Sequence, residues 1–470
     1  MPKRNSGGSF FHNRRLSKSV EARITVHIAD VLQRQRFIIR LCKALILYGA
    51  PTHRLEEFMI MTSRVLELDG QFMYMPGTML MSFGDASTRT SEMQLIKSPE
   101  GLNLHKLQEA YAIYKDVVHD IKGVEEASRD LDDLLSSKPL YSPFLCVLIY
   151  GFGSAMITPM AFSGSWQDMP ICFIIGLLVG FLKFYVSPKS HLYSNVFEVF
   201  ASIVVSFIGR ALGTINDGRT FCFSAVVQGT LALILPGYII LCGSLEIQSR
   251  NIVAGTVRMF YAIIYSLFLG IGITLGAALY GWIDSGAISN LECANSVSPW
   301  YRFIFVPAFT IALALVNQAK WTQMPIMIVI SGIGYVVSYF ASMHFQDSTE
   351  YTSAMAAFVI GVLSNLYSRV YKGLAVSAML PAIFVQVPGG IASKNTLLAG
   401  IQSANKLVIN TTSTTTTAAA AETSSSFSEA SSLAFGFTMI EIALGISVGL
   451  FVSTIAVYPF GKKRTPIFTL

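Results

Sequence analysis

The chain has 470 residues, of which 52% are apolar and only 13% are charged, and its formal net charge is +6. This charged fraction is about half that of a typical soluble domain, which excludes an entirely soluble globular protein. No basic stripe is interleaved with aromatic residues, so nucleic-acid binding is not expected. More than half of the charged residues precede Phe144. We therefore expect a soluble first third and a membrane-embedded remainder.

The soluble part is expected to be a small cytosolic α+β domain over residues 23–143, after a disordered basic tail at 1–22. Helical periodicity over residues 24–47 ends at Gly49, and Thr52 suits the N-cap of a second helix that reaches Leu68. The later elements are expected to be strands at 71–75, 78–83 and 90–96, with turns at Pro76-Gly77 and Gly84-Asp85, and helices at 104–121 and 124–135.

Apolar runs after Phe144 are long enough to span a membrane, which takes about 20 helical residues. No apolar leader precedes them, so both termini are expected in the cytosol. Lys and Arg are missing from three outer loops, in agreement with the positive-inside rule, although Arg210, Arg219, Lys394 and Lys406 run against it. The ten spans are expected at 144–163, 170–187, 195–213, 221–243, 252–280, 301–319, 323–343, 352–371, 373–392 and 433–458.

The spans divide into two membrane repeats, at residues 144–280 and 301–460, with five spans in each. Because five is odd, the second copy enters the membrane in the opposite sense, as in the inverted repeats of many secondary transporters. The sequence thus predicts an all-α polytopic membrane protein of two inverted five-helix repeats behind a soluble α+β domain. The recurring landmarks are Met169-Pro170-Ile171 with Met324-Pro325-Ile326, Ile208-Gly209 with Ile360-Gly361, Pro236-Gly237 with Pro388-Gly389, and Gly272-Ile273-Thr274-Leu275-Gly276 with Gly445-Ile446-Ser447-Val448-Gly449.

Proline and glycine in equivalent apolar runs indicate where a substrate pathway would pass. Pro236 and Gly237 in the first repeat correspond to Pro388, Gly389 and Gly390 in the second. Such breaks turn backbone carbonyls and amides toward a polar solute. The alternative is that they are structural kinks, because proline and glycine are common in membrane helices.

Ionisable residues within spans are the other site candidates, because a charge in the membrane interior is costly. They are Glu198, Arg210, Arg258 and Glu441. The first three lie near span ends, where the charged heads could instead snorkel to the interface. Glu441 lies about eight residues into its span, roughly 12 Å deep at 1.5 Å per residue, and is the candidate for proton coupling.

Neither a catalytic residue nor a cofactor or metal site is expected, so the chain is predicted not to be an enzyme. The sequence has no Walker-type motif, and its seven histidines form no ligand cluster. The six cysteines lack metal-ligand spacing and are interpreted as packing residues without a disulfide framework. Asn410 opens a glycosylation sequon in a Ser/Thr-rich outer loop at 401–432, where a chance sequon in a flexible insert is the alternative.

Four motifs carry a family resemblance: Tyr48-Gly49-Ala50-Pro51-Thr52-His53-Arg54-Leu55-Glu56-Glu57, Gly101-Leu102-Asn103-Leu104, Leu235-Pro236-Gly237 and Val387-Pro388-Gly389-Gly390. With them the sequence resembles the threonine/serine exporter family, and most closely its fungal branch of pheromone-regulated membrane proteins. The resemblance implies export of small amino acids driven by an ion gradient. Related two-chain bacterial systems are associated with dicarboxylates, so the substrate stays open, and the Ser/Thr-rich insert departs from the bacterial pattern.

The expected function is a secondary transporter for small amino acids such as threonine and serine, or for small carboxylates, coupled to protons. The alternative is a non-transporting membrane protein with a sensing or mating and adhesion role. Its partners are expected to be the lipid bilayer and a small solute. A homo-oligomer stays open, as does the membrane of residence, either the plasma membrane or an endomembrane such as the vacuole.

Overall fold

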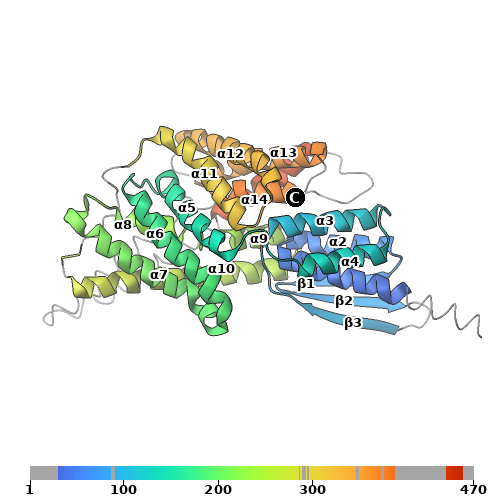
Figure 1. Ribbon diagram of the computed structural model, residues 1–470. Coiled ribbons are helices and arrows are strands. Elements are labelled where there is room, and N and C mark those ends of the chain that lie inside the picture. The colour runs from blue at the N-terminus through green and yellow to red at the C-terminus, as the bar shows by residue number, and fades with distance from the viewer. Residues whose placement is uncertain are drawn as a thin grey trace, which may run out of the picture. The chain divides into compact units, whose positions relative to one another are not determined.

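The computed structural model describes residues 30–85, 90–284, 286–287, 293, 296–345, 349–371, 375–386 and 441–458 (Figure 1). Contacts divide the chain into two compact units. The first comprises residues up to Leu102 together with Lys106–Lys138, and the second comprises Asn103–His105 together with everything from Pro139 onward.

The first unit contains helices and one small sheet. Its three strands form an antiparallel meander in the order β1-β2-β3. The buried side chains of Met79, Met81 and Phe83 alternate along β2 with more accessible neighbours, as the two-residue period of a strand requires. The elements are a helix at 30–48, α2 (Thr52–Val65), β1 (Asp69–Met75), β2 (Thr78–Asp85), β3 (Thr90–Lys97), α3 (Leu104–Val118) and α4 (Val124–Ser136).

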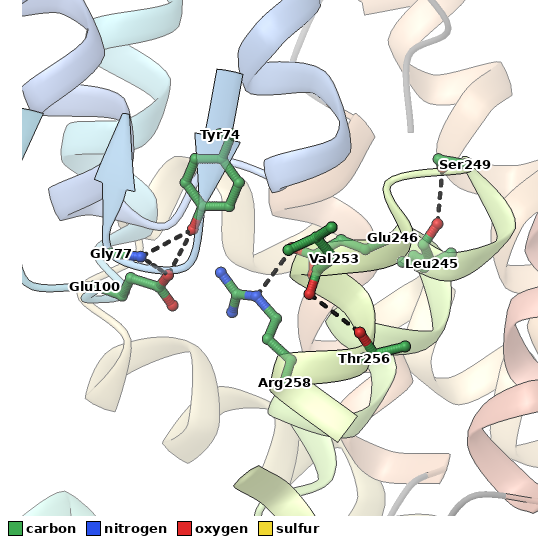
Figure 2. A network of polar contacts seen from close by, with 9 residues as sticks. All are labelled: Tyr74, Gly77, Glu100, Leu245, Glu246, Ser249, Val253, Thr256 and Arg258. Atoms are coloured by element: carbon green, nitrogen blue, oxygen red, sulfur yellow. Dashed lines mark hydrogen bonds and ion pairs between the residues drawn. The ribbon is translucent and has the colours of Figure 1, made fainter. Parts of the chain in front are cut away.

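Two glycines shape the turns of this unit. Gly49 ends the first helix with a φ of 82°, and a side chain there would meet the Gly101 carbonyl oxygen at 2.6 Å. Gly77, with a φ of 73°, closes the β1–β2 hairpin, and its N–H donates to Glu100 Oε1 at 2.8 Å. Glu100 also accepts from the Tyr74 hydroxyl at 2.6 Å (Figure 2). One carboxylate therefore binds both the end of β1 and the turn that follows it.

Two local predictions for this unit are wrong. Thr52 is the first helical residue of α2, and Pro51 occupies the N-cap position without a side-chain hydrogen bond. The expected turn at Gly84 and Asp85 is instead the end of β2, since both residues pair with β3. Ladder hydrogen bonding with a neighbouring strand outweighs the local turn preference of these residues.

The second unit is a bundle of apolar helices. Six helices in the described part of the chain are long and apolar enough to cross a membrane, and four shorter apolar helices accompany them. The elements are α5 (Pro143–Ala161), α6 (Asp168–Phe181), the π-helical turn η1 (Leu182–Val186), α7 (His191–Gly213), α8 (Phe223–Leu231), α9 (Gly237–Gln248), α10 (Ile252–Ile283), α11 (Pro299–Val316), α12 (Met324–His344), α13 (Thr349–Tyr371), α14 (Ala375–Gln386) and the last helix (Glu441–Val457).

The outward-facing surface of this bundle is apolar, as expected of a surface in contact with lipid. Exposed Phe, Ile, Leu and Val side chains follow the outward faces of α5, α6, α10, α12 and the last helix. A soluble monomer rarely exposes a contiguous apolar area of this extent. All four tryptophans are exposed and lie at or beyond helix ends, which is typical of residues at a membrane–water interface: Trp166, Trp282, Trp300 and Trp321.

Small residues bring pairs of these helices into backbone contact. A side chain on Gly276 of α10 would overlap the Ile203 carbonyl oxygen of α7. A side chain on Gly449 of the last helix would likewise overlap the Ala354 carbonyl oxygen of α13. Both glycines belong to a small-xxx-small spacing, which permits such close approach. The recurring sequence landmark therefore makes the same kind of contact in both places.

The core mixes side chains from both expected repeats. One buried cluster joins Ile240 and Leu241 of α9 to Met379 of α14 and Ile446 of the last helix. Within it, the Ser447 hydroxyl donates to the Ser244 hydroxyl at 2.8 Å. Helix α9 is thus held among helices that come more than a hundred residues later in the chain.

The expectation that the cysteines form no disulfide is wrong. Cys222, just before α8, is bonded to Cys293 in the segment after α10, with their Cα atoms 5.3 Å apart. The two are 71 residues apart in sequence, and only the packing of the helices brings them together. Cys42, Cys146, Cys172 and Cys242 are not part of a disulfide.

Candidate functional site

The fourth expected span is two helices with a break between them. Helix α8 ends at Leu231, and α9 begins at Gly237 with Pro236 at its N-cap. Every residue of α8 is buried, so the helix that precedes the break has no lipid-facing side. The predicted pathway residues Pro236 and Gly237 lie at this break, inside the expected span 221–243.

Proline causes this break, because Pro236 cannot donate the intrahelical hydrogen bond that would continue α8. The Ile234 N–H bonds instead to the Leu231 carbonyl at 2.8 Å. The Ile234 carbonyl accepts from the Tyr265 hydroxyl of α10 at 2.9 Å. This carbonyl is therefore bound by a side chain of another helix. Backbone groups left open at a helix break can bind a polar solute in place of a side chain.

The corresponding Pro-Gly motif of the expected second repeat, Pro388, Gly389 and Gly390, lies outside the described residues. The helix that leads to it is described. Helix α14 begins at Ala375, as many residues before Pro388 as Phe223 of α8 lies before Pro236. It is buried along nearly its whole length, as α8 is.

A buried ion pair joins the two helices that follow the break. Arg258 Nε of α10 lies 2.9 Å from Glu246 Oε1 of α9, and Figure 2 shows the two side chains turned toward each other. Their side chains are 9% and 0% exposed, so this charge pair is far from bulk water. The predicted site residue Arg258 is therefore paired and does not snorkel.

Glu246 is not among the predicted site residues, because it lies between the expected spans 221–243 and 252–280, in an expected loop. The turn between α9 and α10 is short, and the Asn251 N–H donates to the Glu246 carbonyl at 2.9 Å. The pair could have been predicted from a sequence pattern in which an acidic residue precedes a tight turn and a basic residue follows it, each in an apolar helix.

Arg210 of α7 is also buried, and the expectation of a snorkelling head at this position is wrong. Its guanidinium donates to the Ala277 carbonyl at 2.8 Å and to the Ala287 carbonyl at 3.4 Å. These acceptors lie in the last turns of α10 and just beyond it, where carbonyls carry the negative end of the helix dipole. Arg210 thus fastens α7 to α10.

The two remaining acidic candidates lie in different settings. Glu198 of α7 is partly buried and interacts electrostatically with Lys183 of η1 and Tyr265 of α10. Glu441 is exposed at the described start of the last helix, whereas Ile442 and Ala443 beside it are buried. Asn410 and its loop lie outside the described residues.

A buried aspartate that the sequence analysis did not single out is structural. The Asp168 carboxylate at the start of α6 accepts from the Ser165 N–H at 2.7 Å, the Ser165 hydroxyl at 2.8 Å and the Cys222 N–H at 3.0 Å. These bonds satisfy it and fix the start of α8. No group of three or more potential metal ligands occurs among the residues that the structure describes.

Comparison with known proteins agrees with this architecture. The family model described as "Putative threonine/serine exporter" matches residues 36–280, and the one described as "Threonine/Serine exporter, ThrE" matches residues 302–456. The boundary between them falls where the second repeat is expected to begin.

Three fungal relatives carry the name pheromone-regulated membrane protein 10. The Kluyveromyces lactis protein is 65% identical over 96% of this chain and 46% of its own length. The Saccharomyces cerevisiae protein is 62% identical over 96% of this chain and 57% of its own, and the Candida albicans protein is 60% identical over 97% and 41%. The chain thus spans about half the length of these relatives.

No solved structure matched the chain. The two family models together cover most of its residues, and the first of them includes residues of both compact units. The chain is an integral multi-pass membrane protein, and it belongs to the threonine/serine exporter family.

Proposed function

We propose that the chain is a secondary transporter for small amino acids or small carboxylates, without enzymatic activity. The observation that carries this proposal is the break between α8 and α9, where the Ile234 carbonyl lies inside the bundle and is bound by Tyr265. Half-helices of this kind offer a polar solute a site without exposing backbone to lipid. The membership of an exporter family supports the same assignment.

We further propose that ten spans form two inverted five-helix repeats. Helices α7 and α13 have 23 residues each. The backbone of each is in close contact with a glycine of a neighbouring helix, Gly276 for α7 and Gly449 for α13. Helices α5 and α11 each begin with proline after a serine N-cap. These likenesses support a duplication, and an odd number of spans per copy would give the two halves opposite orientations.

The proposed orientation places both termini in the cytosol and the Cys222–Cys293 disulfide on the opposite side. Disulfides persist in oxidising compartments and are rare in the cytosol, which fits this side. In sealed right-side-out vesicles, an impermeant phosphine reductant followed by an impermeant maleimide is expected to label Cys222 and Cys293. Labelling that requires permeabilised vesicles would reverse the orientation, and a Cys222→Ser/Cys293→Ser chain is the control for labelling of the four other cysteines.

Proton coupling remains a proposal, with Glu441 as the residue first assigned to it. The test is uptake of radiolabelled threonine, serine and succinate into proteoliposomes under an imposed pH gradient, with wild type beside Glu441→Gln. Gradient-driven flux that falls at least tenfold in the variant is expected if this carboxyl carries the proton. Unchanged flux would keep the transporter and discard the assignment of Glu441.

Absence of flux for every solute, with the protein inserted in the bilayer, would contradict the transport proposal. The alternative is then a sensing or mating role, favoured by the pheromone-regulated name that the fungal relatives carry. Deleting residues 410–432 separates the two functions, because transport should survive the deletion and adhesion should not.

A further inference from the structure

The first half of the bundle contains two buried tyrosine hydroxyls whose presence neither the break nor the Glu246–Arg258 pair explains. Tyr150 of α5, Tyr193 of α7 and Tyr265 of α10 belong to one buried apolar cluster. Tyr150 is 0% exposed. Within the described part of the chain, the Tyr150 and Tyr193 hydroxyls are buried without a hydrogen-bond partner. A buried hydroxyl without a partner is costly, and a ligand would satisfy it.

A cation lies against this cluster. Lys183 Nζ is 5.5 Å from the centre of the Tyr150 ring and 5.8 Å from the centre of the Phe184 ring. Both distances are within the range of a cation–π interaction. Lys183 lies in η1, a π-helical turn at the end of α6. Such turns are rare and frequently occur at functional sites.

An anion faces the same place from another helix. Helix α7 packs against η1, and Glu198 of α7 interacts electrostatically with Lys183 of η1 and with Tyr265. Tyr265 in turn interacts with Tyr150. Among the described residues Glu198 and Lys183 form no direct ion pair, although the two segments that carry them pack against each other. A cation and an anion held apart in an aromatic setting match the two charges of a small zwitterion.

We propose that Lys183, Glu198 and Tyr150 form the binding site for a zwitterionic amino acid. The solute carboxylate pairs with Lys183, its ammonium group pairs with Glu198, and the Tyr150 hydroxyl bonds to it. This inference rests on the proposed transport function and narrows its substrate class. A dicarboxylate fits less well, because its second negative charge would meet Glu198. Tyr265 connects the site to the break, because its hydroxyl holds the Ile234 carbonyl.

The test measures binding separately from transport. The full-length chain is purified in detergent, and its thermal unfolding is followed with L-serine, 3-hydroxypropionate, ethanolamine or succinate. The second and third probes lack the ammonium and the carboxylate of serine respectively. Serine alone is expected to stabilise wild type. Glu198→Gln and Lys183→Met are each expected to raise the half-saturating serine concentration at least tenfold, and Tyr150→Phe about threefold.

Two features of the design make the result specific. Glu198→Gln should narrow the difference between serine and 3-hydroxypropionate, since an amide no longer selects for an ammonium group. Lys189→Met and Glu67→Gln, at exposed positions, are the matched controls and should bind serine as wild type does. If Lys183→Met or Glu198→Gln does not fold, Lys183→Arg and Glu198→Asp replace them and should shift the affinity in the same direction.

The outcomes separate this inference from the transport proposal. Wild-type serine affinity in all three variants would overturn the site, even where proteoliposomes transport serine. Stabilisation of wild type by succinate but not by serine, or by no probe at all, would overturn it as well. Serine binding that the variants weaken, in a protein that moves no solute, would keep the site and overturn the transport proposal.

Discussion

Replacing Arg258 with alanine is expected to lower the free energy of unfolding by about 3 kcal/mol, because it leaves the Glu246 carboxylate buried without its counter-charge. Glu246→Ala should have an effect of similar size, since the guanidinium is 9% exposed and also cannot reach bulk water. Titration with sodium dodecyl sulfate in mixed micelles, followed by tryptophan fluorescence, measures these differences.

The double variant Glu246→Gln/Arg258→Gln tests whether the two charges stabilise each other or act independently. Removing both charges eliminates the uncompensated group, so the double variant should be more stable than either alanine variant. Arg369→Ala, at an exposed position of α13, is the matched control and should change the free energy by less than about 0.5 kcal/mol. A double variant that is no more stable than either alanine variant would show that the two buried charges do not compensate each other.

The positions of the membrane helices could be predicted because their signal is local. The described helices α5, α7, α10 and α13 begin and end within a few residues of the expected spans. A run of apolar residues of sufficient length is enough to make a spanning helix, whatever its neighbours are. The meander of β1, β2 and β3 was also predictable, because short β-prone runs alternate with turn residues.

The contacts that build the candidate site could not be predicted in the same way. Glu246 and Arg258, Cys222 and Cys293, and Tyr265 with the Ile234 carbonyl are pairs separated by 12 or more residues, and packing brings them together. Hydropathy carries no information on which face of one helix meets which face of another. For that reason Glu246 was assigned to a loop and the cysteines to simple packing.

Replacing Gly276 with alanine is expected to destabilise the bundle by about 1–3 kcal/mol, the range observed when extra atoms are forced into a packed interface. The added Cβ would overlap the Ile203 carbonyl oxygen, which is part of helix α7 and cannot rotate away. Gly449→Ala should cost a similar amount, because its Cβ would overlap the Ala354 carbonyl oxygen of α13. The same detergent titration measures both variants.

Gly270 provides the matched control, because it lies in α10 with Gly276 and a Cβ there would meet nothing within 4 Å. Gly270→Ala should leave stability unchanged or raise it by up to about 1 kcal/mol, since alanine has the higher helix propensity. Equal effects at Gly270 and Gly276 would mean that helix propensity, and not contact with α7, determines the result. Losses confined to Gly276 and Gly449 would instead show that two equivalent glycines hold two equivalent helix pairs together, as a duplicated five-helix unit requires.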